Sequence, residues 1–180
     1  MKEWDRPALK ILVEKPNLIG AEIGVDSGGN ALNILKYLDI TKLYLIDVWK
    51  GYSDNKNKEL NGDGVIGDDL IAQKCFEHAR NSLKDYNDKI VWIQDYSENA
   101  YKLIRDKELD FIYIDGNHRY EWVKRDIELY YSKVKIGGLV AGHDYKLQYK
   151  NDVIKAVHEF FEPLKKQIYV QIWDWWSYKE

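Results

Sequence analysis

The residues best suited to chemistry stand where short apolar runs of this sequence stop. The run "DFIYID" ends at Asp115 and is followed by His118, and the run "GGLVAGHD" ends in His143 and Asp144. Three earlier runs end in the same way, at Gly24, Asp47 and Asp95. A carboxylate accepts hydrogen bonds and an imidazole exchanges protons near neutral pH. These endings therefore predict a site for binding or catalysis.

The elements that must position these residues follow from hydrophobic periodicity. Apolar residues at helical spacing lie between the runs, which predicts strands and helices that alternate along the chain, as in a parallel sheet covered on both faces. The predicted strands are 18–24, 42–47, 89–95, 109–115 and 137–144. The helical repeats are Ile71, Cys75, Ala79 and Leu83; Val123, Ile127, Tyr130 and Val134; and Val153, Val157, Phe160 and Leu164.

The end of the chain breaks this alternation. "QIYVQIW" is followed almost at once by "DWWSYKE", with no room for a crossover helix, so an antiparallel pair must close the sheet. Trp173, Trp175 and Trp176 are expected to anchor this pair against a helix. The predicted fold is a Rossmann-like, mostly parallel seven-stranded sheet with helices on both faces and a C-terminal antiparallel strand pair. Ligands bind such a sheet beyond the carboxyl ends of its strands.

Composition favours one globular domain over residues 1–180, with a helical lead-in over 1–17. The 30 acidic and 27 basic residues are mixed along the chain, which argues against a nucleic-acid partner. The single cysteine, Cys75, fits a reducing compartment, and no segment has the length and apolarity of a membrane span. We therefore expect a cytoplasmic protein without membrane contact. The long irregular stretch 48–69 is interpreted either as a lid or substrate-binding loop or as a plain surface loop.

The first strand end indicates a nucleoside-containing ligand. "AEIGVDSGGNALNIL" runs through a glycine turn into a helix whose first amides can face a polar ligand. Asp47, about twenty residues further on, is placed to accept the hydroxyl hydrogens of a ribose. A dinucleotide and an adenosyl sulfonium both satisfy this pair of features. Asp26 occupies a position where the dinucleotide fingerprint needs glycine.

A resemblance decides between the two ligands. "AEIGVDSGGNA", "LYLIDVW", "VWIQDYSENA", "YIDGNHRYEWVKRDIELYYSKVKIGGLVAGHDY" and "WDWWSYK" have the order and spacing of class I S-adenosylmethionine-dependent methyltransferases. They are most similar to the branch that contains catechol O-methyltransferase and the macrolide-sugar O-methyltransferases. The resemblance implies S-adenosylmethionine as cofactor and methyl transfer to an oxygen of a small hydroxylated or sugar-like acceptor.

The same resemblance implies a role for each strand end. The methionine part of the cofactor would be held by Glu22, Gly24, Val25, Gly28 and Asn30. Asp47 would bind the ribose, and Asp95, Tyr96 and Ser97 the adenine; Ser97 also suits the N-cap of a helix. Trp49 and Tyr52 begin the long loop and are candidates to cover the cofactor.

A divalent metal, Mg²⁺ or Mn²⁺, is a further implication, with Asp115, His143 and Asp144 as its ligands. Related enzymes more usually show two oxygen donors where His143 and Asp144 stand, and imidazole suits ions softer than Mg²⁺. Three arrangements stay open. His143 turns away while the carboxylates bind Mg²⁺, His143 joins a site for a softer ion, or the metal is lost and His143 contacts the substrate.

His118 follows Asp115 at the place where related enzymes put a basic residue beside the acceptor hydroxyl, which makes it the candidate general base. It also suits a helix cap or a contact to a substrate oxygen. His78 and His158 lie on predicted amphipathic helices and are assigned to the surface or to packing. Two other functions are weighed: a binding module that kept the nucleoside site without turnover, and an NAD-dependent oxidoreductase, which Asp26 and the closing strand pair disfavour.

Overall fold

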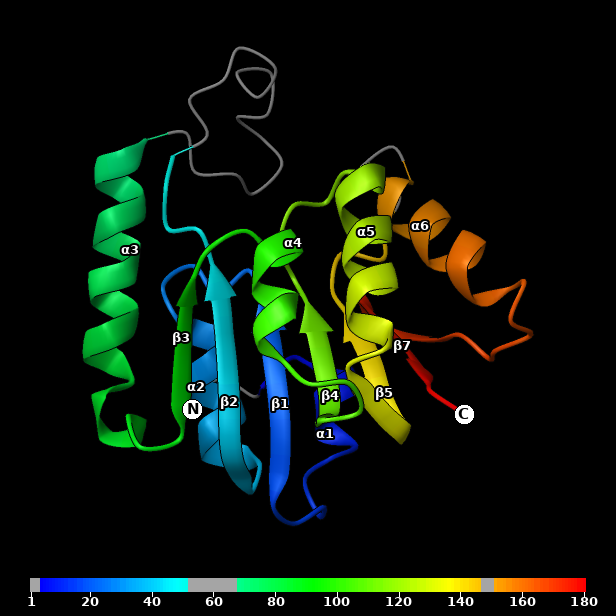
Figure 1. Ribbon diagram of the computed structural model, residues 1–180, viewed down its shortest axis with the longest axis horizontal. Helices are drawn as coiled ribbons and strands as arrows, with labels where there is room; N and C mark the ends of the chain where they lie inside the picture. The colour runs from blue at the N-terminus through cyan, green and yellow to red at the C-terminus, as the bar shows by residue number, and fades with distance from the viewer. Residues whose placement is uncertain (1–3, 52–67, 147–150) are drawn as a thin grey trace.

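The predicted sheet is confirmed in the computed structural model of the protein, which describes residues 4–51, 68–146 and 151–180. Seven strands form one sheet in the order β3-β2-β1-β4-β5-β7-β6 (Figure 1). The first five strands run parallel, and the pairings of β7 with β5 and with β6 are antiparallel. The carboxyl ends of β1, β2, β3 and β4 therefore meet at one edge. The strands are β1 Leu18–Ile23, β2 Ile40–Asp47, β3 Ile90–Gln94, β4 Leu109–Ile114, β5 Val134–Gly142, β6 Tyr169–Gln171 and β7 Asp174–Tyr178.

Helices cover both faces of the sheet, as predicted, and each face has its own core. The core on one face gathers apolar residues of α1, α2 and α3, and the core on the other gathers those of α4, α5 and α6. In the described part of the chain, each helix is too short or too polar to cross a bilayer. The helices are α1 Pro7–Lys10, α2 Gly29–Tyr37, α3 Asp69–Ser82, α4 Ser97–Ala100, α5 Tyr120–Tyr131 and α6 Asp152–Phe161, with short 3-10 turns η2 Lys84–Tyr86 and η3 Tyr101–Leu103.

The central strand β4 shows how the apolar run holds the two layers together. Phe111 and Tyr113 are buried in the core under α1, α2 and α3, whereas Ile112 and Ile114 are buried under the opposite helices. Each such side chain contributes about 1.5–3 kcal/mol when it is removed from water. A strand buried on both faces has a continuous apolar run, here from Phe111 to Ile114, and Asp115 marks where the chain leaves the core.

Two predicted helical repeats extend too far. α5 ends at Tyr131, and Val134 is instead the first residue of β5, where it pairs with Leu109. Only two residues separate α5 from β5, so the apolar spacing continued across the junction by coincidence. Likewise α6 ends at Phe161, and Leu164 is 44% exposed beyond it.

The three tryptophans of the terminal pair differ in their surroundings. Trp175 is fully buried beside Phe161 of α6, and Trp176 stacks on Tyr169 of β6. The anchoring prediction is wrong for Trp173, which is 47% exposed with the ammonium of Lys146 4.3 Å from its ring. Trp173 lies in the tight turn between β6 and β7, so it points away from the sheet core.

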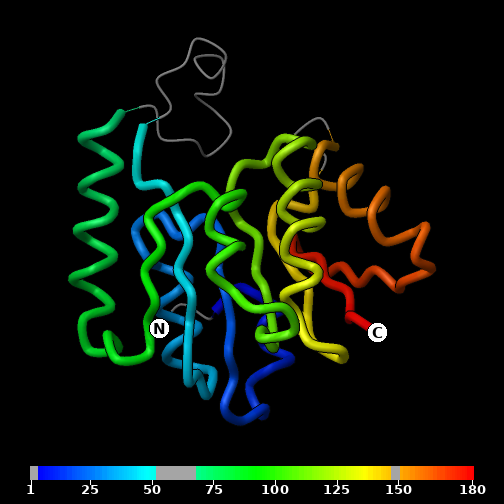
Figure 2. The backbone as a smooth tube through the Cα atoms, viewed as in Figure 1, coloured from blue at the N-terminus to red at the C-terminus, as the bar shows by residue number. Residues whose placement is uncertain are grey.

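A segment near the start of the described chain contacts a segment near its end. Figure 2 shows the first segment in blue and the last strand in red. The contact is specific, because the backbone amide of Ala8 in α1 donates to Asp174 Oδ2 at 3.1 Å. Of the 48–69 loop, residues 52–67 lie outside the described residues, as does Tyr52, so the lid interpretation stays a prediction, as does the single domain over 1–180.

Candidate active site

A pocket lies at the carboxyl ends of β1, β2, β3 and β4. It holds about 820 Å³ of space, including the part open to solvent, and its walls combine apolar side chains with carboxylates. Nine of its lining residues are Gly24, Ile46, Asp47, Trp49, Asp95, Tyr96, Ser97, Asp115 and Trp122. The predicted ribose and adenine residues therefore line one pocket together with Asp115.

Asp47 has a structural role that the sequence did not indicate, because its carboxylate accepts three backbone hydrogen bonds. Its Oδ2 accepts hydrogen bonds from the backbone amides of Val25 and Asp26 at 2.9 and 3.0 Å, and its Oδ1 accepts one from Trp49 at 2.9 Å. The carboxylate thus joins the loops that follow β1 and β2. Since a carboxylate offers about four acceptor positions, about one remains for a ribose hydroxyl rather than two.

The part of the pocket lined by the predicted adenine residues contains a residue that sequence reasoning missed. Ser97 does not cap α4, whose N-cap is Tyr96; its Oγ donates instead to Asp126 Oδ1 of α5 at 2.5 Å. Asp126 is buried and lines the pocket, and burial raises its pKa to about 7. A signal existed in the sequence, because Asp126 lies three residues after Val123 on the apolar face of a helix, where a carboxylate is costly without a role.

Gly24 allows the loops after β1 and β4 to touch. Its φ is +83°, and a Cβ at this position would lie 2.2 Å from the carbonyl oxygen of Asp115. Three residues other than glycine at this edge also have left-handed backbone: Asp26 at φ 49°, Trp49 at 40° and Asp144 at 57°. Such conformations cost free energy and concentrate at functional sites.

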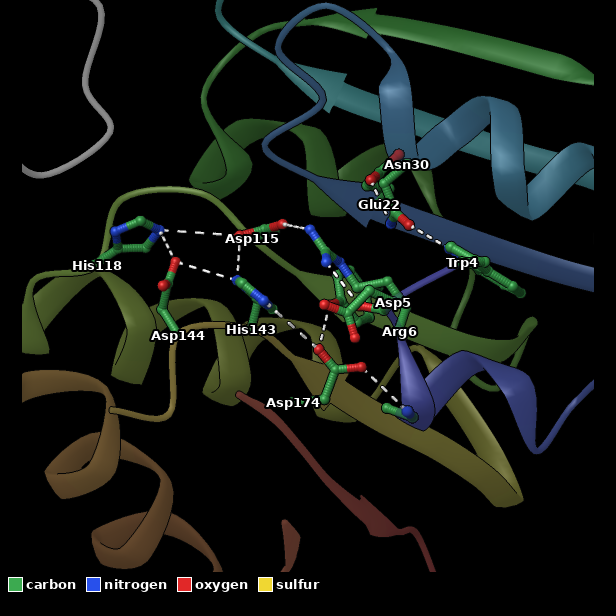
Figure 3. Close-up of polar contacts among 12 residues, drawn as sticks. Trp4, Asp5, Arg6, Glu22, Asn30, Asp115, His118, His143, Asp144 and Asp174 are labelled. Carbon is green, nitrogen blue, oxygen red and sulfur yellow. Dashed lines mark hydrogen bonds and ion pairs between the residues drawn. The ribbon is translucent and has the colours of Figure 1, made fainter. Parts of the chain in front are cut away.

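Beyond Asp115 the two predicted histidines and Asp144 form one cluster. His118 Nε2 lies 2.8 Å from Asp144 Oδ2 and 3.9 Å from Asp115 Oδ1, and His143 Nδ1 lies 3.4 and 3.8 Å from the same two carboxylates (Figure 3). Lys146 Nζ is 2.6 Å from Asp144 Oδ1. The ends of β4 and β5 therefore bring together the residues for which catalysis or metal binding was predicted.

The charges in this cluster fix its protonation. Burial by itself lowers the pKa of His118, but the neighbouring carboxylates of Asp115 and Asp144 outweigh burial and raise that pKa to about 9. Burial alone would raise the pKa of Asp144, yet His118, His143 and Lys146 hold it well below its usual range. At neutral pH His118 is an imidazolium paired with an ionised Asp144.

Arg6 and Asp174 complete the site from the two ends of the chain, and neither was predicted. The Arg6 guanidinium points toward Asp115 in Figure 3, with its Nη2 3.7 Å from Asp115 Oδ2. Asp174 accepts from Tyr113 Oη at 2.7 Å and lies 4.0 Å from His143 Nε2. Burial raises the pKa of Asp174 to about 6. No local pattern marks either residue, since each acts only through the tertiary contact.

The residues predicted for the methionine end lie beneath the pocket rather than in its wall, Gly24 excepted. Glu22 is buried, and its Oε1 accepts from Asn30 Nδ2 at 2.9 Å, while Asn30 Oδ1 accepts from Trp4 Nε1 at 3.0 Å. Val25 is buried in the core, and Gly28 is the N-cap of α2 with a φ of 83°. These residues hold the loop after β1 in shape.

The comparison with known families settles the class of protein. A family model described as a methyltransferase domain matches residues 21–145, well over half of the chain. The chain belongs to this family. The matched region begins in β1 and ends beyond β5, so it contains the pocket and the cluster around Asp115.

One sequence relative and two solved methyltransferase structures are similar to this chain. An uncharacterized protein R132 of Acanthamoeba polyphaga mimivirus is 28% identical over 149 residues, which are 81% of this chain and 60% of that relative's length. The structure of the O-methyltransferase NovP matches with a TM-score of 0.64 at 18% identity, over 95% of this chain and 77% of NovP. A putative methyltransferase from Streptococcus mutans in complex with SAH matches with a TM-score of 0.65 at 14% identity, over 96% and 94% of the two chains.

The candidate metal ligands lie close enough together to bind a cation, but their negative charge is already balanced by neighbouring cations. Asp115, His118 and Asp144 each offer a ligand atom, and these atoms lie within 4.8 Å of one another. His143 Nδ1 also lies within 4 Å of the same two carboxylates. The two carboxylates already face three cations: Arg6, His118 and Lys146. A divalent ion would have to displace the His118 proton and Lys146.

Proposed function

We propose that this protein transfers a methyl group from S-adenosylmethionine to an oxygen of a small hydroxylated or sugar-like acceptor. The observation that carries the proposal is that Asp115, which lines the pocket, also borders a cluster able to exchange a proton. The ordered motifs and the methyltransferase domain support the same reaction.

The pocket residues suit the nucleoside part of the cofactor. Ile46 and Trp49 provide apolar walls for a purine, Asp95 and Ser97 provide polar groups at its edge, and Asp47 keeps an acceptor position for the ribose. When bound, the cofactor supplies an electrophilic methyl group on a sulfonium. Asp115, at the end of the pocket, provides the negative charge that suits the cationic end of this ligand.

The acceptor would approach from the side of Asp115 that faces away from the pocket. His118, Asp144 and His143 lie there, and the half-exposed indole of Trp173 lies 6.2 Å from the His143 ring, measured between centroids. An indole favours the flat face of an aromatic or sugar ring. Trp173 therefore supports an acceptor that has a ring next to its reactive hydroxyl.

His118 is the group that we assign to the acceptor proton. Its Nε2 faces Asp115 and Asp144, so a hydroxyl placed between these residues can hydrogen-bond to the imidazole. Only the neutral imidazole accepts a proton, and this form is in the minority until the pH approaches the raised pKa of about 9. We assign no step to a metal, because Arg6, His118 and Lys146 already balance the carboxylates.

The proposal is tested by binding and by turnover. Calorimetry of the full chain is expected to show binding of S-adenosylmethionine and S-adenosylhomocysteine, and no binding of NADH. Incubation with a panel of catechols, phenols and sugars is expected to add one methyl group to at least one compound, as detected by mass spectrometry. Binding without methylation across the panel would favour the binding module, and absence of binding would refute the proposal.

A further inference from the structure

We infer that Arg6, in the segment before β1, binds the carboxylate of the cofactor's methionine end, so that this segment forms part of the cofactor site. The inference rests on the proposed function and adds to it a residue outside the matched family region, which begins at residue 21. It also gives a function to the hydrogen bonds that fix the segment before β1 to the rest of the molecule. Four observations support it.

The first observation is that Arg6 has unused hydrogen-bonding capacity. A guanidinium offers five N–H donors. Arg6 uses one in a hydrogen bond to the exposed backbone oxygen of Asp5 at 2.8 Å, and its Nε is buried without a hydrogen-bond partner. The contact of Arg6 Nη2 with Asp115 Oδ2, at 3.7 Å, is too long for a hydrogen bond. A buried donor in this state costs free energy unless a ligand completes it.

The second observation is the position of the guanidinium. Asp115 lines the pocket, and Arg6 Nη2 lies 3.7 Å from its Oδ2, with 23% of the Arg6 side chain exposed. Figure 3 shows Arg6 extending toward Asp115 from the N-terminal segment, on the side of Glu22. A ligand that fills the pocket and continues past Asp115 therefore meets Arg6 next.

The third observation is the order of charges. Asp115 is followed by Arg6, which matches the opposite charges of an amino-acid zwitterion: the ammonium beside Asp115 and the carboxylate beside Arg6. Glu22 lies within electrostatic range of both residues and keeps a buried Oε2 without a hydrogen-bond partner. Arg6 Nε thus lacks an acceptor and Glu22 Oε2 lacks a donor. The carboxylate and the ammonium of an amino-acid group would supply them.

The fourth observation is that the segment is held firmly in place. Trp4 Nε1 donates to Asn30 at 3.0 Å, and the Ala8 amide donates to Asp174 at 3.1 Å, so Arg6 lies between two fixed points. Trp4, Ala8 and Leu9 are buried in the core. A guanidinium on such a segment loses little further freedom when it binds a carboxylate.

The test compares two ligands that differ by one carboxylate, S-adenosylhomocysteine and its decarboxylated form, by calorimetry on the full chain. Arg6→Met is expected to weaken S-adenosylhomocysteine on the order of 10- to 100-fold, the loss typical of a charge-assisted hydrogen-bond pair. Binding of the decarboxylated ligand is expected to stay within about 2-fold of wild type, because it makes no contact that Arg6 supplies. Arg6→Lys, which keeps the charge without the planar fork, is expected to fall between the two.

Lys10→Met is the matched control, since it removes a positive charge from an exposed position of the same segment. It is expected to bind both ligands as wild type does. Equal weakening of both ligands by Arg6→Met, or unchanged binding of S-adenosylhomocysteine, overturns the inference and leaves the proposed function intact. A wild-type chain that binds neither ligand overturns the proposed function, and the inference with it.

Discussion

The charge state of a residue at this edge of the sheet depends on its charged neighbours. His118 has the same side chain as His78 and His158 but, like His143, it lies within 4 Å of two carboxylates, Asp115 and Asp144. Those neighbours turn a group that titrates near neutral pH into a cation over most of the physiological range. The sequence singled out His118 as the candidate general base, whereas its charge state came from the tertiary contacts.

The pH dependence of turnover tests His118. With its pKa raised to about 9, the neutral fraction grows about tenfold per pH unit below that value, so turnover is expected to rise with pH and level off near 9. His118→Ala is expected to lower turnover on the order of a hundredfold and to flatten the profile, with cofactor affinity retained. The exposed His78→Ala is the control. Wild-type turnover in His118→Ala would remove His118 from the mechanism.

Chelation tests the metal. Because Arg6, His118 and Lys146 already face the two carboxylates, we expect turnover to survive chelator treatment. Separate additions of Mg²⁺ and Mn²⁺ distinguish the arrangements left open for His143. Loss of turnover that Mg²⁺ alone restores would indicate an all-oxygen site, and restoration by Mn²⁺ in preference would indicate an imidazole ligand.

At the scale of elements, the site depends on how closely two strand ends approach. β1 and β4 are adjacent in the sheet, and the loops after them are in contact through Gly24 and Asp115. The polar residues that end the apolar runs could be predicted from the sequence, because each strand leaves the core where it ends. The order of strands in the sheet could not, since it depends on pairings between distant segments.

Gly24→Ala tests this approach. The new Cβ would meet the Asp115 carbonyl at 2.2 Å in a backbone conformation that disfavours alanine, so the loop must move. We expect a loss of about 1–3 kcal/mol in the free energy of unfolding and weaker binding of S-adenosylhomocysteine. Gly29→Ala is the control, because nothing lies within 4 Å of its Cβ position at the start of α2. Equal urea stability of both variants would contradict the steric argument.

At the scale of the whole molecule, segments from near both ends of the described chain bring residues to the site, Arg6 before α1 and Asp174 in β7. α1 and β7 meet through Ala8 and Asp174, and Asp174 also accepts from Tyr113 of the central strand. Several carboxyl groups are buried in the process, among them Glu22, Asp126 and Asp174. A buried carboxyl group favours its neutral form, which links folding to pH.

Glu22 is the strongest case. Burial raises its pKa from 4.5 to about 8, with Asn30, Asp115, Arg6 and Asp47 as its polar neighbours, so its contribution is complete below about pH 4.5 and is lost as the pH rises through 8. The free energy of unfolding is expected to fall on the order of 1–2 kcal/mol between about pH 6 and pH 8 through this group.

The matching variant is Glu22→Gln, which stays neutral and can still accept from Asn30. It is expected to flatten the fall in stability, as measured by urea unfolding across this pH range, whereas the exposed Glu14→Gln keeps the wild-type slope. Asp126 and Asp174, with pKa values raised to about 7 and 6, contribute in the same direction and remain in both variants. An unchanged slope in Glu22→Gln would assign the pH dependence to them instead.

The sequence by itself determined the class of fold, the strand ends and most of the pocket, because periodicity and the polar residue that ends a buried run are local properties. Gly24, Asp47, Asp95 and Asp115 were found in this way. Only the tertiary structure decided that backbone amides occupy most of the acceptor positions of the Asp47 carboxylate, that His118 is a cation, and that Arg6 and Asp174 lie beside Asp115 and His143. These outcomes depend on distances between segments far apart in the chain, and no local pattern records such distances.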